Sequence, residues 1–93
     1  MSKILIVDDN IETQTYLTTR LSLEGFVTIN ANSGPRALSL ALSHKPDVLL
    51  IDAIMGGQDG VTTLRHLRED TWGNTVPVIL YSSVILDDAL LNR

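Results

Sequence analysis

Three aspartates that follow short apolar runs are the residues of this sequence best suited to chemistry. Asp8 and Asp9 end the run "KILIVDD", and Asp52 ends the run "DVLLID". A carboxylate at the end of a buried strand costs free energy unless a partner compensates its charge. Such oxygen donors suit Mg²⁺, which keeps several waters and bridges to phosphate oxygens. A carboxylate beside that cation can attack phosphorus, so the pattern predicts that Asp52 is a phosphoacceptor.

The elements that must position these acids alternate along the chain. Apolar runs predict strands at residues 3–9, 26–31, 47–52 and 76–83. Helical patterns fill the segments between them, up to Glu24, at 33–46 and at 61–69, and residues 86–93 could open a fourth helix. In the second of these helices Ser33 suits the N-cap and Pro35 the first turn, while Pro46 ends it. Its apolar face is expected to include Leu38, Ala41 and Leu42.

Strands that alternate with helices and are almost continuously apolar predict an α/β fold with a parallel sheet covered on both faces. All strand C-termini then lie at one edge, where such sheets bind ligands. We therefore expect Asp8 and Asp9 to meet Asp52 there, with the hydroxyls of Ser82 and Ser83 alongside. Three carboxylates so close would raise one another's pKa values unless a cation lay among them.

Composition limits the classes of protein that fit. Ninety-three residues with 44% hydrophobic content predict one small domain spanning residues 1–93. A net charge of −4 argues against direct binding to nucleic acid or to an anionic membrane. There is no cysteine, no apolar run near the roughly 18 residues of a membrane span, and no signal-peptide pattern at the N-terminus. The sequence therefore predicts a cytoplasmic domain.

The chain resembles the receiver (response-regulator) domain of two-component signalling in the segments "ILIVDDN", "DVLLIDAIMGGQDG" and "VPVILYSS". The resemblance covers essentially the whole chain and implies a flavodoxin-like doubly wound sheet in strand order 2-1-3-4. It implies that Asp8 and Asp9 hold Mg²⁺, Asp9 most directly, and that the backbone carbonyl of Ile54 completes the metal shell. Asp52 would take a phosphoryl group from a histidine kinase or phosphotransfer protein, and Ser82 would be the hydroxyl that moves toward it. The domain would then switch a partner or output domain, and it would be no enzyme beyond its own phosphorylation and dephosphorylation.

The chain departs from the family pattern in two places. Gly56 stands where a proline is usual, which predicts a looser loop after Asp52. The family's fifth strand, with its phosphate-pairing lysine, and its fifth helix would lie beyond Arg93. Neither Lys3 nor Lys45 matches that lysine, so no residue is assigned its role. We accordingly expect a receiver domain that is incomplete at its C-terminus and that could self-associate through its fourth strand.

Two other classes of protein remain open on the sequence alone. One is a pseudo-receiver, an interaction module with the same fold that is not phosphorylated. The other is an enzyme or cofactor-binding protein on a similar sheet. A flavodoxin-like cofactor site would need a phosphate-cradling turn after the first strand, where this chain has Asp8 and Asp9. Mg²⁺-dependent acyl phosphate on Asp52 would separate the receiver from both.

Structural explanations compete with function at several positions. Asp8, Asp9 and Asn10 could simply cap the first helix, and Asp59–Gly60 reads as turn and cap chemistry. His44 and His66 are expected to be exposed and to bind no metal. Trp72 is expected to pack locally and to recognise no ligand, and Asp87–Asp88 to form the first turn of a helix and no second metal site.

Overall fold

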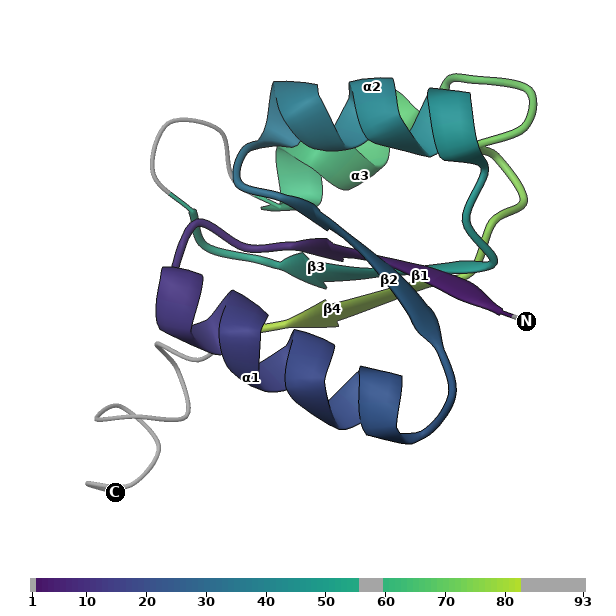
Figure 1. Ribbon diagram of the computed structural model, residues 1–93. Coiled ribbons are helices and arrows are strands. Elements are labelled where there is room, and N and C mark those ends of the chain that lie inside the picture. Colours follow the sequence, from purple (N-terminus) through teal and green to yellow (C-terminus); the bar gives the residue numbers. More distant parts are fainter. Residues whose placement is uncertain (1, 56–59, 83–93) are drawn as a thin grey trace.

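Four parallel strands alternate with three helices in the computed structural model of the protein, which describes residues 2–55 and 60–82 (Figure 1). In chain order the elements are β1 (Lys3–Val7), α1 (Ile11–Leu23), β2 (Val27–Ala31), α2 (Gly34–His44), β3 (Val48–Asp52), α3 (Gly60–Arg68) and β4 (Val78–Tyr81). The strands form one sheet in the order β2-β1-β3-β4, and every neighbouring pair is parallel. The predicted fold class and strand order are therefore confirmed.

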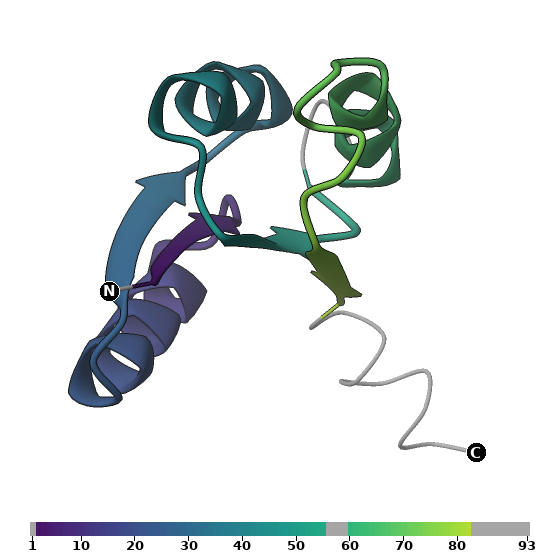
Figure 2. The same ribbon diagram turned by 90° about the vertical axis from the view of Figure 1, so that its right-hand side faces the viewer.

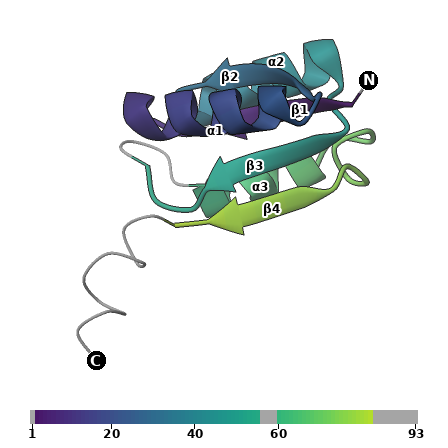
Figure 3. The same cartoon turned by 60° about the horizontal axis from the view of Figure 1, so that its bottom comes forward.

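Helices lie on both faces of the sheet. Figure 2 shows α2 and α3 side by side on one face, and α1 on the other. Figure 3 shows α1 running along the β1–β2 side, with β3 and β4 beside it. The main core lies between the sheet and the α2–α3 layer, and its larger buried side chains are Leu5, Val7, Leu49, Ile51 and Leu67.

The continuous apolar pattern of the strands has different consequences at the centre and at the edge. Ile4 to Val7 of β1 are all buried, as expected of a central parallel strand. In β4, by contrast, Ile79 is 54% exposed and Leu80 is 40% exposed. An apolar pattern of this kind is typical of a strand covered on both faces, but in this chain the fourth strand was expected to be an edge with uncovered apolar side chains, and the exposures agree with that expectation. In the part of the chain that is described, β4 pairs with β3 alone, so its other side is an edge of the sheet.

Local polar groups decide where the elements begin and end. β1 ends at Val7, two residues earlier than predicted, because the chain turns where Asp8 accepts a hydrogen bond from the Asn10 N–H. Ser33 caps α2 through its Oγ, which accepts from the Arg36 N–H at 3.3 Å, as predicted. The same helix ends at Lys45 in the left-handed conformation, just before Pro46. Of the three residues predicted for its apolar face, Ala41 is buried and Leu38 packs against the core, whereas Leu42 is 44% exposed.

Several sequence predictions lie outside the described residues. These concern Gly56, Asp59, Ser83, Asp87–Asp88 and the helix expected at 86–93. Across residues 2–55 and 60–82, none of the helices has the length and apolar character needed to cross a membrane.

Candidate functional site

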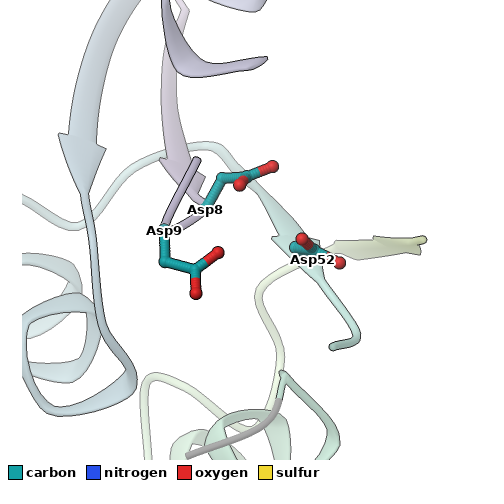
Figure 4. A group of neighbouring side chains, drawn as sticks. All are labelled: Asp8, Asp9 and Asp52. Carbon is teal, nitrogen blue, oxygen red and sulfur yellow. The ribbon is translucent and has the colours of Figure 1, made fainter. Parts of the chain in front are cut away.

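Three aspartates come together at the C-terminal edge of the sheet, as the sequence predicted (Figure 4). One carboxylate oxygen from each of Asp8, Asp9 and Asp52 lies within 4.8 Å of the others. The grouping follows from the topology, because β1 and β3 are parallel neighbours and both end here. Asp8 is fully buried and Asp52 is 3% exposed, whereas Asp9 is exposed to solvent.

A tight turn after β1 fixes the acidic pair. Asn10 is the N-cap of α1, and its Oδ1 accepts from the N–H groups of Glu12 and Thr13 at 2.9 and 3.0 Å. The Asn10 N–H in turn donates to Asp8 Oδ1 at 2.8 Å. Asn10 therefore caps α1. The exposed carboxylate of Asp9 faces the other two acids.

The side chain of Gln14 ties α1 to the same edge of the sheet. Its Nε2 donates to the backbone carbonyls of Asp8 at 2.6 Å and of Ala31 at 2.9 Å. Ala31 ends β2, so one amide group links the first turns of α1 to the ends of both β1 and β2. This contact holds the backbone of the acidic turn in place, and nothing in the sequence pattern pointed to Gln14.

A second turn fixes Asp52 at the end of β3. Its Oδ1 accepts from the Ile54 N–H at 3.1 Å, and the Ala53 N–H donates to the Tyr81 carbonyl at 2.7 Å. Gly60, the first residue of α3, donates its N–H to the Ala53 carbonyl at 3.0 Å. The phosphoacceptor predicted from the sequence is thus held from both sides by backbone hydrogen bonds.

The three acids affect one another's ionisation, which is seen at Asp52. Burial raises the pKa of Asp52, and the neighbouring charges of Asp8 and Asp9 raise it further, while the hydrogen bond from Ile54 acts in the opposite direction. A divalent cation would relieve the repulsion. The donors are all carboxylate oxygens, a set that fits Mg²⁺ and gives no reason to invoke a softer metal.

Tyr81 is a second residue at the site, after Gln14, that was not predicted from the sequence. Its hydroxyl donates to Asp8 Oδ2 at 2.6 Å, and Asp52 is its partner across the β3–β4 ladder. In the sequence, Tyr81 continues the apolar run of the fourth strand. The available signal was its place at the end of that strand, immediately before Ser82, where strand residues reach the acidic edge.

The roles predicted for Ile54 and Ser82 stay predictions, and the structure gives only the burial and chain position of these residues. Ile54 is 47% exposed and directly follows the Asp52 turn, and Ser82 is half-buried just after β4. His44 and His66 are exposed, as predicted. Trp72 is half-buried and packs against the core, which agrees with a local packing role.

Comparison with known proteins agrees with this geometry. Residues 4–91 match the family described as the response regulator receiver domain. This chain belongs to that family. The receiver domain is 36% identical over 83 residues to the protein PilH of Pseudomonas aeruginosa, covering 89% of this chain and 69% of PilH. It is 35% identical over 83 residues to the response regulator PleD of Caulobacter vibrioides, covering 89% of this chain and 18% of PleD.

A solved structure shares the fold of this receiver domain. It is the receiver domain of the sensor histidine kinase PA1611 from Pseudomonas aeruginosa, with a magnesium ion coordinated in its active site cleft. The two superpose with a TM-score of 0.85 at 27% sequence identity, over 98% of this chain and 75% of the other.

Proposed function

We propose that this receiver domain is a phosphorylation switch in which Asp52 accepts a phosphoryl group in the presence of Mg²⁺. The observation that carries the proposal is the gathering of Asp8, Asp9 and Asp52 within 4.8 Å. The magnesium ion in the related PA1611 domain supports the choice of cation. Asp8 and Asp9 would hold it together with Asp52 and the backbone carbonyl of Ile54.

In the proposed transfer, a carboxylate oxygen of Asp52 attacks the phosphorus of a phosphohistidine. The new oxygen–phosphorus bond forms as the phosphorus–nitrogen bond breaks, and the electron pair stays on the imidazole nitrogen of the donor. Asp52 must be ionised to attack, although burial and its acidic neighbours raise its pKa. Bound Mg²⁺ would favour the ionised form and offset the negative charge of the phosphoryl oxygens. Ser82 would donate a hydrogen bond to one of those oxygens.

The proposed partners follow from membership of the family. A sensor histidine kinase or a phosphotransfer protein would supply the phosphoryl group, and an output domain or effector protein would read the result. The chain spans less than a fifth of the length of PleD. We propose a cytoplasmic location, and the net charge of −4 argues against direct contact with nucleic acid.

The test is labelling by a small phosphodonor such as acetyl phosphate with Mg²⁺, followed by intact mass. We expect one added phosphoryl group that hydroxylamine removes and that EDTA prevents. Asp52→Asn should abolish this labelling, because an amide does not attack phosphorus in this way. Asp47→Asn is the matched control: Asp47 is exposed and lies just before β3, so this variant should be labelled like the wild-type protein. Full labelling of Asp52→Asn would overturn the assignment.

A further inference from the structure

The phenol of Tyr81 connects two strands that are not neighbours. Tyr81 ends β4, Asp8 follows β1, and β3 lies between these strands in the sheet. The Tyr81 hydroxyl nevertheless donates to Asp8 Oδ2 at 2.6 Å, a short bond of the kind expected between a hydroxyl and an ionised carboxylate. The contact therefore passes across the end of β3, where Asp52 lies.

Asp8 depends on this contact because water does not reach it. The residue is fully buried, and its two carboxylate oxygens have different protein donors. Oδ1 accepts from the Asn10 N–H at 2.8 Å, and Oδ2 accepts from Tyr81. A buried carboxylate with a donor on each oxygen has a fixed orientation. Without the Tyr81 hydroxyl, Asp8 Oδ2 would lose this donor, and no solvent reaches the buried side chain to replace it.

The phenol can act as this donor throughout the neutral pH range. Burial, the hydrogen bond to Asp8 and the charges of Asp8 and Asp52 all raise the pKa of Tyr81. The phenol therefore keeps the proton that it donates to Asp8.

We propose that Tyr81 is a positioning residue of the cation site: it holds Asp8 in the orientation in which the three acids share a divalent ion, and so sets the affinity for that ion. The inference rests on the proposed function, because the affinity in question is that for Mg²⁺. It assigns to the end of β4 a part in cation binding, in addition to the acids supplied by β1 and β3.

Two effects of the phenol oppose each other. Its hydrogen bond draws charge away from Asp8 and thereby weakens the attraction for a cation. It also fixes Asp8 in place, so that binding need not order that side chain. Residues that hydrogen-bond to metal ligands usually strengthen metal binding by orienting the ligand, and their loss lowers metal affinity by about 10- to 100-fold. We therefore expect the orienting effect to be the larger one.

The experiment measures Mg²⁺ affinity by calorimetric titration of the wild-type protein, Tyr81→Phe and Tyr16→Phe. Tyr16 is the only other tyrosine of the chain and is 61% exposed on α1, so the control removes the same hydroxyl from a distant surface. We expect Tyr81→Phe to weaken Mg²⁺ binding by about tenfold and Tyr16→Phe to leave it unchanged. Equal or tighter binding by Tyr81→Phe would overturn the inference. Absence of binding by the wild-type protein would instead overturn the proposed function.

A double-mutant cycle separates positioning from a general loss of structure. If Tyr81 acts through Asp8, then Tyr81→Phe should change the affinity little in a protein that already carries Asp8→Asn. An undiminished tenfold effect in that background would contradict action through Asp8.

A measurement on the wild-type protein covers the case in which a variant fails to fold. The two tyrosines give two ¹³Cζ resonances when tyrosine is labelled at that carbon. Mg²⁺ should shift the Tyr81 resonance, with a midpoint that matches calorimetry, and should leave that of Tyr16 in place. A Tyr81 resonance that ignores bound Mg²⁺ would overturn the inference.

Discussion

Gly60 at the start of α3 lies directly against the backbone carbonyl of Asp52. A Cβ atom on Gly60 would overlap that carbonyl oxygen and would come within 2.8 Å of both the Asp52 carbonyl carbon and Ile51 Cγ2. The Gly60 N–H also donates to the Ala53 carbonyl at 3.0 Å. The absence of a side chain therefore allows α3 to begin beside the strand end that carries Asp52.

Gly60→Ala is accordingly expected to lower the free energy of unfolding by about 1–3 kcal/mol, the usual cost of forcing an extra methyl group into a packed site. It should also weaken Mg²⁺ binding, because the backbone of Asp52 must shift. Urea denaturation and calorimetric titration measure the two effects.

Gly73→Ala is the matched control for that substitution. Gly73 lies in the turn that follows α3, and a Cβ atom there would overlap the backbone carbonyl of Leu67. Gly73 is not part of the acidic cluster. It should lose stability without losing Mg²⁺ affinity. Equal loss of affinity in both variants would show that the effect of Gly60→Ala is not local to the site.

The sequence predicted the three acids because they depend on topology alone. Parallel strands bring their C-terminal ends to one edge, so Asp8, Asp9 and Asp52 had to meet once the strand–helix alternation was recognised. Tyr81 could not be found in this way. Its hydroxyl reaches Asp8 only because of the β3–β4 register, which pairs Tyr81 with Asp52, and no pattern in one sequence specifies that register.

The helix faces were predicted less well, for a related reason. Leu42 and Val61 fit an apolar helical stripe, yet they are 44% and 47% exposed. The buried positions of α2 are held by small residues, Gly34, Ala37 and Ala41, of which only Ala41 was predicted. Hydrophobic periodicity finds a helix, but the rotation of the helix on the sheet depends on side-chain sizes on both surfaces.

Asp52→Asn is expected to stabilise the protein at pH 7 in the absence of Mg²⁺. The pKa of Asp52 is raised above its ordinary value of 3.8, mainly by burial, so the folded state holds this proton more tightly than the unfolded state. As the pH rises above 3.8 the unfolded state loses the proton first, and folding becomes less favourable. Asparagine has no such proton, and its Oδ1 can still accept from the Ile54 N–H.

The measurement is the free energy of unfolding of both proteins by urea from just below the ordinary carboxyl pKa to about four units above it, that is, between about pH 3.5 and pH 8. The advantage of Asp52→Asn should shrink as the pH falls toward 3.8, and added Mg²⁺ should reduce it at pH 7. A variant less stable than the wild-type protein at pH 7 would contradict the assigned origin of the raised pKa.

Asp9→Ala is expected to remove most Mg²⁺ binding. Asp9 is the exposed member of the cluster, so its loss should cost little folding free energy while it removes one carboxylate from the group. The dissociation constant should rise by about tenfold or more, since even indirect partners of a metal have effects of that size. Glu69→Ala is the control, because it makes the same change in net charge at an exposed position after α3. Unchanged affinity of Asp9→Ala would reject Asp9 as a ligand.

The exposed side of β4 leads to a prediction about self-association. In the described residues β4 has a strand partner on one side only. Ile79 of β4, which pairs with Leu50 of β3, is 54% exposed. An edge strand with open backbone groups and apolar side chains is a template for another chain. We therefore predict that the 93-residue chain associates as its concentration rises, through β4 and the adjoining face of the sheet. Sedimentation velocity over a concentration range measures this.

Ile79→Lys should shift that association toward monomer, because a charge on an edge strand opposes pairing with a second chain. The position is already more than half exposed, so the lysine ammonium can reach water without a large loss of stability. Leu42→Lys is the control, since Leu42 is 44% exposed on α2, on the opposite side of the sheet from α1. It introduces the same charge, so any general gain in solubility would appear in both variants. A wild-type chain that stays monomeric and unfolds cooperatively at every concentration would defeat the prediction, and equal effects of the two lysines would place the contact elsewhere.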